Sequence, residues 1–125
     1  MAAVSGSDRL TRGGYRQIVT LALITLPLAG CKVAADGQNL QGARLYQSGQ
    51  YDVAMQKFQK AVAADPTNAD GYYNMACTTH RMGIARNDQN VLNQAETMYN
   101  QCLDLDENHT DCHRALAVLL VETGR

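Results

Sequence analysis

The sequence has no tryptophan, a single phenylalanine and only two prolines among its 125 residues. Without large aromatic residues, a core must be built from Leu, Val, Met, Ala and the six tyrosines. The frequent small residues favour closely packed helices. No stretch alternates apolar and polar residues with a period of two, which argues against β-strands. The sequence therefore predicts one all-α domain.

The chain also lacks an excess of either charge. Its 11 Lys and Arg are offset by 12 Asp and Glu, a formal net charge of −1. Because nucleic-acid binding requires a basic surface, we expect no nucleic-acid partner. Nucleophile motifs and a glycine-rich phosphate loop are missing as well. We therefore expect neither enzyme activity nor a cofactor.

The N-terminal apolar run is too short to cross a membrane. Residues 18–30 are 13 residues without a charge, whereas a transmembrane helix needs about 20. Three arginines lie in the preceding residues 1–17. A positive segment before a short apolar stretch is typical of an export signal peptide, and we predict one over residues 1–30.

The end of this signal resembles a bacterial lipobox. Leu28-Ala29-Gly30-Cys31 places a cysteine directly after a small-residue cleavage site. The resemblance implies that the chain is cut before Cys31, which then carries acyl chains such as palmitate. Two or more such chains hold a protein stably at a membrane. Lys32 stands where inner-membrane lipoproteins of enterobacteria have Asp, so the resemblance implies a bacterial envelope lipoprotein facing the periplasm from the outer membrane.

Residues of the same kind recur at fixed spacings along the rest of the chain. An offset of 34 residues relates Gly42 to Ala76 and Gly49 to Gly83. An offset of 41 relates five pairs: Ala76 and Ala117, Gly83 and Gly124, Ala54 and Ala95, Ala61 and Cys102, and Asp65 and Asp106. A period of 34 is typical of the tetratricopeptide repeat, a unit of two antiparallel helices.

The first unit resembles this family in its details. Residues 42–51 resemble the family's first helix and turn, and residues 54–66 its second helix and closing Asp-Pro. Pro66 ends the helix because the residue before a proline avoids helical geometry. The resemblance implies a short α-solenoid of about two and a half repeats after the N-terminal signal. The segments expected are a lipidated cysteine and tether (31–38), a repeat domain (39–125), and units at about 35–68, 69–109 and an incomplete 110–125.

Seven extra residues separate Gly83 from Ala95 in the second unit. Seven residues are nearly two turns at 3.6 residues per turn. We therefore expect them to lengthen the unit's second helix without rotating its buried face. Its N-cap would be Asn87, Asp88 or Asn90, and the alternative is a polar loop.

The third unit contains one helix, for which Thr110 or Asp111 is the expected N-cap. Leu116 to Val121 are six apolar residues in a row, and a helix that is apolar on nearly every face is normally buried. Either the chain is a truncated fragment of a longer repeat protein, or this helix docks against another protein or a second copy of itself. We favour truncation.

The family resemblance also implies a concave face lined by the first helix of each unit. The candidates for it are Asn39, Ala43, Tyr46, Gln47, Asp70, Tyr73, Cys77, His80, Arg81, Arg114, Val118, Val121 and Glu122. Tyr and Arg are frequent interface anchors. The residues we select for protein binding are Tyr46, Gln47, Tyr73, Cys77, His80, Arg81 and Arg114; the alternative is that they are ordinary solvated residues.

The paired Lys/Asn clamp with which some family members hold a carboxylate is absent. The expected partner is another protein or peptide of the cell envelope, held by a membrane-anchored scaffold. Assembly of an envelope or secretion machine is the role that family analogy suggests.

Cysteine and histidine residues leave a second function open, a redox or metal-binding envelope protein. Cys102, His109, Cys112 and His113 cluster near the C-terminus, but their spacing matches neither a zinc module nor a haem motif. We therefore expect no metal. An exported protein meets an oxidising compartment, so Cys102 and Cys112 form a candidate disulfide across the turn between units. The alternative is that they and Cys77 are inert buried thiols.

Overall fold

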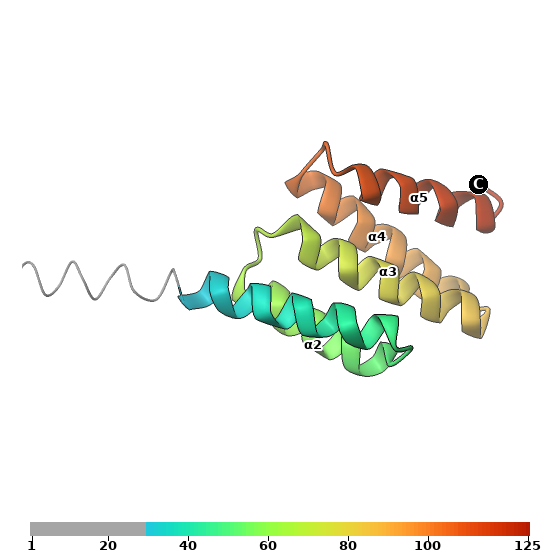
Figure 1. The fold of residues 1–125 in the computed structure, drawn as a ribbon. Helices are drawn as coiled ribbons and strands as arrows, with labels where there is room; N and C mark the ends of the chain where they lie inside the picture. Colours follow the sequence, from blue (N-terminus) through green and yellow to red (C-terminus); the bar gives the residue numbers. More distant parts are fainter. Residues whose placement is uncertain (1–29) are drawn as a thin grey trace, which may run out of the picture. The chain divides into compact units, whose positions relative to one another are not determined.

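The computed structural model describes residues 30–125, of which residues 34–125 form one compact unit. The predicted signal peptide lies outside the described residues as far as residue 29. The regular elements described are a helix of residues 30–47 and helices α2 (Tyr51–Ala64), α3 (Ala69–Arg86), α4 (Gln89–Leu105) and α5 (Thr110–Glu122) (Figure 1). Between residues 30 and 125, no helix is both long and apolar enough to cross a membrane.

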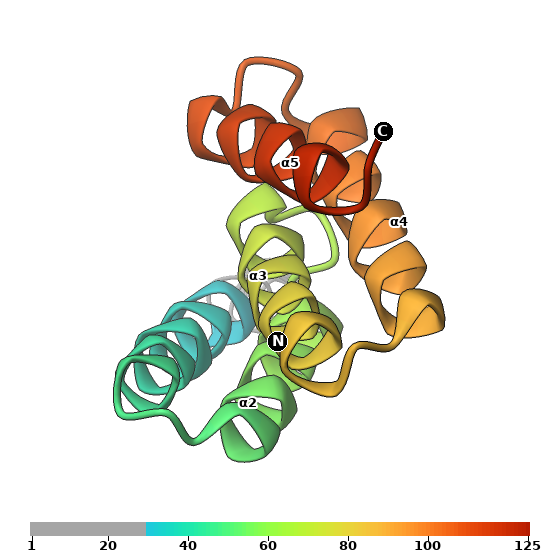
Figure 2. The same cartoon turned by 90° about the vertical axis from the view of Figure 1, so that its right-hand side faces the viewer.

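The helices are arranged as successive antiparallel pairs. Helix 30–47 pairs with α2, α3 pairs with α4, and α5 packs mainly on α4 (Figure 2). No strand occurs in the described part of the chain. The predicted all-α solenoid of helix pairs is therefore confirmed.

Each pair turns at a residue in the left-handed conformation. Gly49 has a φ of +80° between helix 30–47 and α2, and the N–H of Gln50 donates to the carbonyl of Leu45 at 2.9 Å. Asn87 has a φ of +50° between α3 and α4. Glycine adopts this conformation without strain, and asparagine tolerates it better than most residues do.

The seven extra residues of the second unit lengthen both of its helices, rather than only the second. The turn residue Asn87 lies 38 positions after Gly49 instead of 34, so α3 takes four of the extra residues and α4 takes three. Asp88 is the N-cap of α4, which agrees with one of the three predicted caps. Its carboxylate accepts bonds from two backbone N–H groups at 2.9 and 3.3 Å.

Gly83, which the 34-residue offset relates to the turn residue Gly49, lies inside α3. A Cβ atom on Gly83 would come within 2.7 Å of Leu92 Cδ2 and 3.2 Å of Leu92 N. In the first pair, a Cβ on Gly42 would lie 2.5 Å from Phe58 Cε1. Both pairs thus place a glycine of the first helix directly beneath a large side chain of the second helix.

The connections that lead from one unit to the next repeat the same hydrogen bonds. Asp65 and Asp106, 41 residues apart, each accept a bond from the backbone N–H two residues later, at 3.2 and 3.1 Å. Asn68 then caps α3 through its side chain. Glu107 replaces Pro66 in the second connection, and the same turn forms without the proline.

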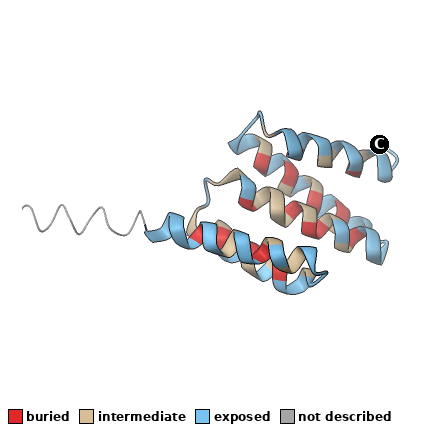
Figure 3. Ribbon diagram, in the orientation of Figure 1, coloured by how far each residue is buried: buried red, intermediate tan, exposed pale blue. Residues whose placement is uncertain are grey.

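Buried residues lie on the facing sides of the helices (Figure 3). One cluster of buried residues consists of Ala76, Ala95, Tyr99, Cys102, Cys112 and Leu119. Only the last two of these belong to α5. Although α5 is apolar on nearly every face, Val118 and Val121 are 48% and 78% exposed. Only the side of α5 that meets α4 and α3 is covered.

The segment expected to be a tether is part of a helix. Residues 31–38 are helical and continuous with helix 30–47. Ala35 is fully buried, so packing begins before residue 39. The physical reason is local, since Ala34 and Ala35 are strong helix formers.

Replacement of Gly83 with Ala should destabilise the protein, although Ala is the better helix former. The added methyl overpacks against Leu92, at a cost of about 1–3 kcal/mol. Gly37 is a matched control, because it is also helical but a methyl group added there would meet nothing within 4 Å. Gly37→Ala should stabilise by up to about 1 kcal/mol. Urea unfolding midpoints measure both, and a stabilising Gly83→Ala would contradict the packing role.

Candidate protein-binding groove

A pocket of about 330 Å³ lies where helix 30–47, α3, α4 and α5 meet. Its lining residues are Tyr46, Tyr73, Cys77, His80, Arg81, Ile84, Tyr99, Asp111, Arg114, Ala115, Val118 and Glu122. Six of the seven residues selected from the sequence therefore surround one space. The seventh, Gln47, lines an adjoining pocket of about 270 Å³ that shares Tyr46, Tyr73 and Cys77 with the first. We call the two pockets together the groove.

Sequence reasoning missed six residues of the groove: Phe58, Asn74, Ile84, Tyr99, Asp111 and Ala115. Ile84 was missed because it follows Gly83, the position that the 34-residue offset relates to the turn at Gly49. Tyr99 belongs to a second helix, and only first helices were expected to line the face. Asp111 lies three residues before Arg114, and Ala115 lies three residues before Val118, a helical spacing that could have identified both.

A chain of polar contacts crosses the floor of the groove. Tyr99 Oη lies 3.3 Å from His80 Nδ1 and 3.5 Å from Cys77 Sγ. His80 Nε2 lies 2.7 Å from Glu122 Oε2 and so joins α3 to α5. Burial raises the pKa of Cys77 and of the phenols of Tyr73 and Tyr99 above their ordinary values. These three groups are therefore protonated at neutral pH, where a thiol is a poor nucleophile.

Two arginines stand at the rim of the groove. Arg81 is exposed and lies beside the hydroxyl of Tyr46, which raises the pKa of the guanidinium. Arg114 pairs with Asp111 at 3.4 Å across the surface of α5. Exposed pairs of this kind contribute about 0–1 kcal/mol. Since each guanidinium carries five N–H donors, both arginines keep donors for a ligand.

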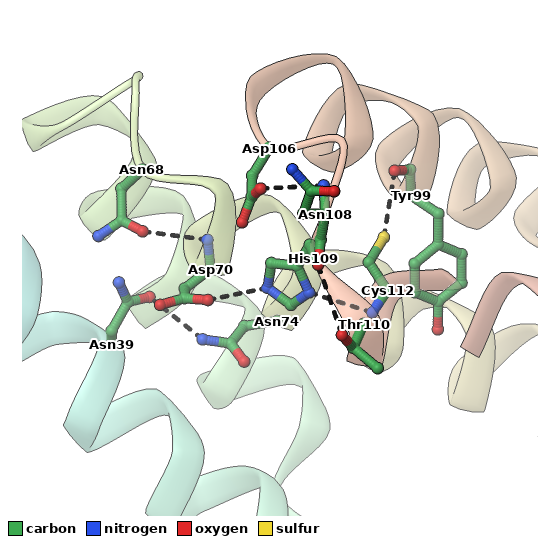
Figure 4. Close-up of polar contacts among 10 residues, drawn as sticks. All are labelled: Asn39, Asn68, Asp70, Asn74, Tyr99, Asp106, Asn108, His109, Thr110 and Cys112. Carbon is green, nitrogen blue, oxygen red and sulfur yellow. Dashed lines mark hydrogen bonds and ion pairs between the residues drawn. The ribbon is translucent and has the colours of Figure 1, made fainter. Parts of the chain in front are cut away.

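Beside the groove, His109 in the connection between α4 and α5 contacts both α5 and α3 (Figure 4). His109 Nδ1 accepts the backbone N–H of Cys112 at 3.1 Å, and His109 Nε2 lies 2.9 Å from Asp70 Oδ1. The histidine is therefore the N-cap of α5 and also holds it to the start of α3. The predicted caps, Thr110 and Asp111, are wrong because the helix begins one residue earlier than expected.

Figure 4 places a cysteine, a histidine and an aspartate in one network, yet the geometry is not that of a nucleophile and its base. The sulfur of Cys112 donates to the carbonyl of Tyr99 at 3.2 Å, and only its backbone meets His109. A nucleophile must instead be within hydrogen-bond reach of the base through its reactive atom. The network therefore orients helices.

The candidate disulfide is not formed in this structure. Cys102 and Cys112 are free and fully buried thiols. Burial raises the pKa of both, which disfavours the thiolate that disulfide formation requires. In residues 30–125, no group of three or more His, Cys, Asp and Glu residues is arranged to hold a metal ion.

Comparison with known proteins agrees with the helix-pair architecture. Residues 42–83 match the family model of the TPR repeat. No curated protein matches the chain. One solved structure that matches is the first TPR of Spaghetti (RPAP3) bound to the HSP90 peptide SRMEEVD. It shares 20% identity over 75% of this chain and 96% of that chain, with a TM-score of 0.41. Repeats of this class form concave protein-binding surfaces.

Removal of the His109 side chain should loosen α5. His109→Ala removes the cap, the bond to Asp70 and the ring contact with Tyr73, whose centroid is 5.0 Å away. Loss of an N-cap alone costs about 1–2 kcal/mol. His109→Asn should lose less, because asparagine is itself a good cap. Thermal unfolding would measure the stability of both variants. If Thr110→Ala were as unstable as His109→Ala, the capping role of His109 would be contradicted and Thr110, the cap predicted from the sequence, would be favoured.

Proposed function

We propose that this chain is a scaffold that binds a segment of another protein in the groove. The observation that carries the proposal is the convergence of three tyrosines and two arginines on one preformed pocket. Tyr and Arg are enriched among the residues that dominate binding energy. Tyrosine provides a large contact area at a low cost in side-chain entropy.

The size of the pocket indicates what it holds. Ligand pockets range over roughly 300–1,000 Å³, and a pocket of about 330 Å³ is at the small end of this range. It suits one or two side chains of a polypeptide better than a large cofactor. An apolar side chain would enter between Cys77, Ala115 and Val118, and the arginines at the rim would bond the ligand's carbonyl or carboxylate oxygens.

The scaffold is further proposed to act at a membrane in the bacterial cell envelope. The support is the lipobox resemblance at Cys31, an exposed cysteine, preceded by the signal-like residues 1–30. Acyl chains on Cys31 would hold the groove at the periplasmic side of the outer membrane. The role would be that of an adaptor in the assembly of an envelope or secretion machine.

Removal of the two rim arginines should weaken peptide binding at least tenfold. Peptides are selected on the full chain from a random displayed library, and their affinities are measured by calorimetry. The test variant is Arg81→Ala/Arg114→Ala. The matched control is Arg44→Ala/Arg86→Ala, which removes the same charge at exposed positions outside the groove. An equal loss in both variants would show that charge alone attracts the peptide, and the groove assignment would fail.

Lipid attachment is tested separately, by expression in a Gram-negative host fed a fatty acid that carries an alkyne tag. The wild-type chain should incorporate the tag and appear in the membrane fraction, and mass spectrometry should find an acylated N-terminal Cys31. Cys31→Ser should lose the tag, whereas Cys77→Ser should keep it. Tagging that does not depend on Cys31, or a chain that retains residues 1–30, would rule out the anchor.

A further inference from the structure

Helices α3, α4 and α5 each have a side-chain N-cap, and that of α5 alone is an imidazole. Asn68 and Asp88 cap α3 and α4 through side-chain oxygens that accept backbone N–H bonds. In α5 the acceptor is His109 Nδ1, which lies 3.1 Å from the backbone nitrogen of Cys112. Histidine ordinarily changes its charge between about pH 5 and 8, whereas carboxylates stay ionised in that range and amides do not titrate. The cap of α5 is therefore sensitive to acid in a way that the other two are not.

The backbone of α5 determines which nitrogen of His109 carries the proton (Figure 4). The N–H of Cys112 can only donate, so Nδ1 is the unprotonated nitrogen. The proton of the neutral ring is then on Nε2, which donates to Asp70 Oδ1 at 2.9 Å. A second proton has only Nδ1 to occupy, and an N–H group at that position cannot accept a hydrogen bond. Protonation of the ring and capping of α5 therefore exclude each other.

The groups around the ring act on its proton in both directions. The carboxylate of Asp70 attracts the proton, and the positive end of the α5 dipole repels it. The other titratable side chains of the adjacent segments are Tyr73 of α3, Tyr99 of α4, Asp106 and Glu107 of the connection, and Asp111, Cys112 and His113 of α5. Their balance affects the pH at which the ring is protonated. In either case the cap bond is absent from the protonated form.

The start of α5 provides part of the groove. Asp111, Arg114 and Ala115 belong to the first two turns of α5 and line the larger pocket. The ring of His109 also packs against Tyr73, at a centroid distance of 5.0 Å, and Tyr73 lines both pockets. A helix end that loses its cap leaves a backbone N–H group without a partner, and its first turn is destabilised. The wall that α5 contributes to the groove therefore depends on a neutral His109.

We propose that His109 is a pH-sensitive cap, which holds the first turn of α5 at neutral pH and releases it when acid protonates the ring. On release, the N–H of Cys112 loses its acceptor, and the contact with Asp70 becomes an ion pair between a cation and a carboxylate. The consequence for the groove rests on the proposed function, since it assumes that the groove binds a ligand. The release of the cap needs no ligand and is measured without one.

Exchange of backbone amide hydrogens with solvent, followed by NMR on the full chain at about pH 7.5 and about pH 5, measures the release. Each rate is compared with that of an unstructured amide at the same pH, which gives a protection factor. Protection of the Cys112 N–H should fall about fivefold or more at the lower pH, the effect expected for loss of an N-cap. Val91 is the internal control, because its N–H has the same position in α4 and its acceptor, the carboxylate of Asp88, remains ionised.

Two variants identify the group responsible. His109→Asn replaces the imidazole with a good cap that does not titrate, so protection of the Cys112 N–H should be the same at both pH values. His113→Gln should behave as the wild type does, because His113 Nε2 contacts the carbonyl oxygen of Glu107 at 2.8 Å and does not cap α5. Peptides selected for groove binding should bind more weakly at the lower pH to the wild type, but not to His109→Asn.

Three results would overturn the proposal. The first is protection of the Cys112 N–H that is equal at both pH values in the wild type. The second is the same fall in His109→Asn, which would assign the effect to another group. The third is an equal fall at Val91, which would show a general loosening of the fold. A failure to select any groove peptide would instead contradict the proposed function, and the amide measurement would still decide whether the cap is released.

Discussion

Close contact between paired helices requires a residue without a side chain beneath a bulky one. Gly42 beneath Phe58 and Gly83 beneath Leu92 meet this requirement, and the distances leave no room for a methyl group at either position. The approach of the second helices fixes how the first helices are oriented. Because the first helices supply most of the groove, its shape depends on these two packing contacts, although Phe58 is the only one of the four residues that lines it.

The helix pairs could be predicted because the small and large positions are spaced regularly along the chain. The ends of the helices were harder to predict, because one residue type can serve two purposes. A glycine closes a turn at position 49, where φ is +80°, but at position 83 it permits close packing. Only the position of Leu92 distinguishes the two roles. In the same way, His109 caps a helix through a ring nitrogen, an acceptor that cap preferences based on Ser, Thr, Asp and Asn do not anticipate.

The candidate groove was predictable only where its residues share one helix. Tyr73 and Arg81 lie on the same first helix, at a spacing that puts them on one face. Such a spacing can be predicted from the sequence. Tyr99 lies on a second helix and is buried, yet its hydroxyl reaches His80 and Cys77. Whether a side chain of α4 can contact residues of α3 depends on the distance between the two helices. The spacing of residues along the sequence does not give this distance. Conversely, the six consecutive apolar residues of α5 could not show which of its faces is covered by α4.

The placement of the tyrosines also has a spectroscopic consequence. Three of the six tyrosines line the groove, and the chain has no tryptophan to accept their excitation energy or mask their emission. Part of the ultraviolet fluorescence of the unlabelled protein therefore comes from the groove. A ligand that displaces water from Tyr46 and Tyr73 would alter that emission, so the native chain carries its own optical reporter of occupancy.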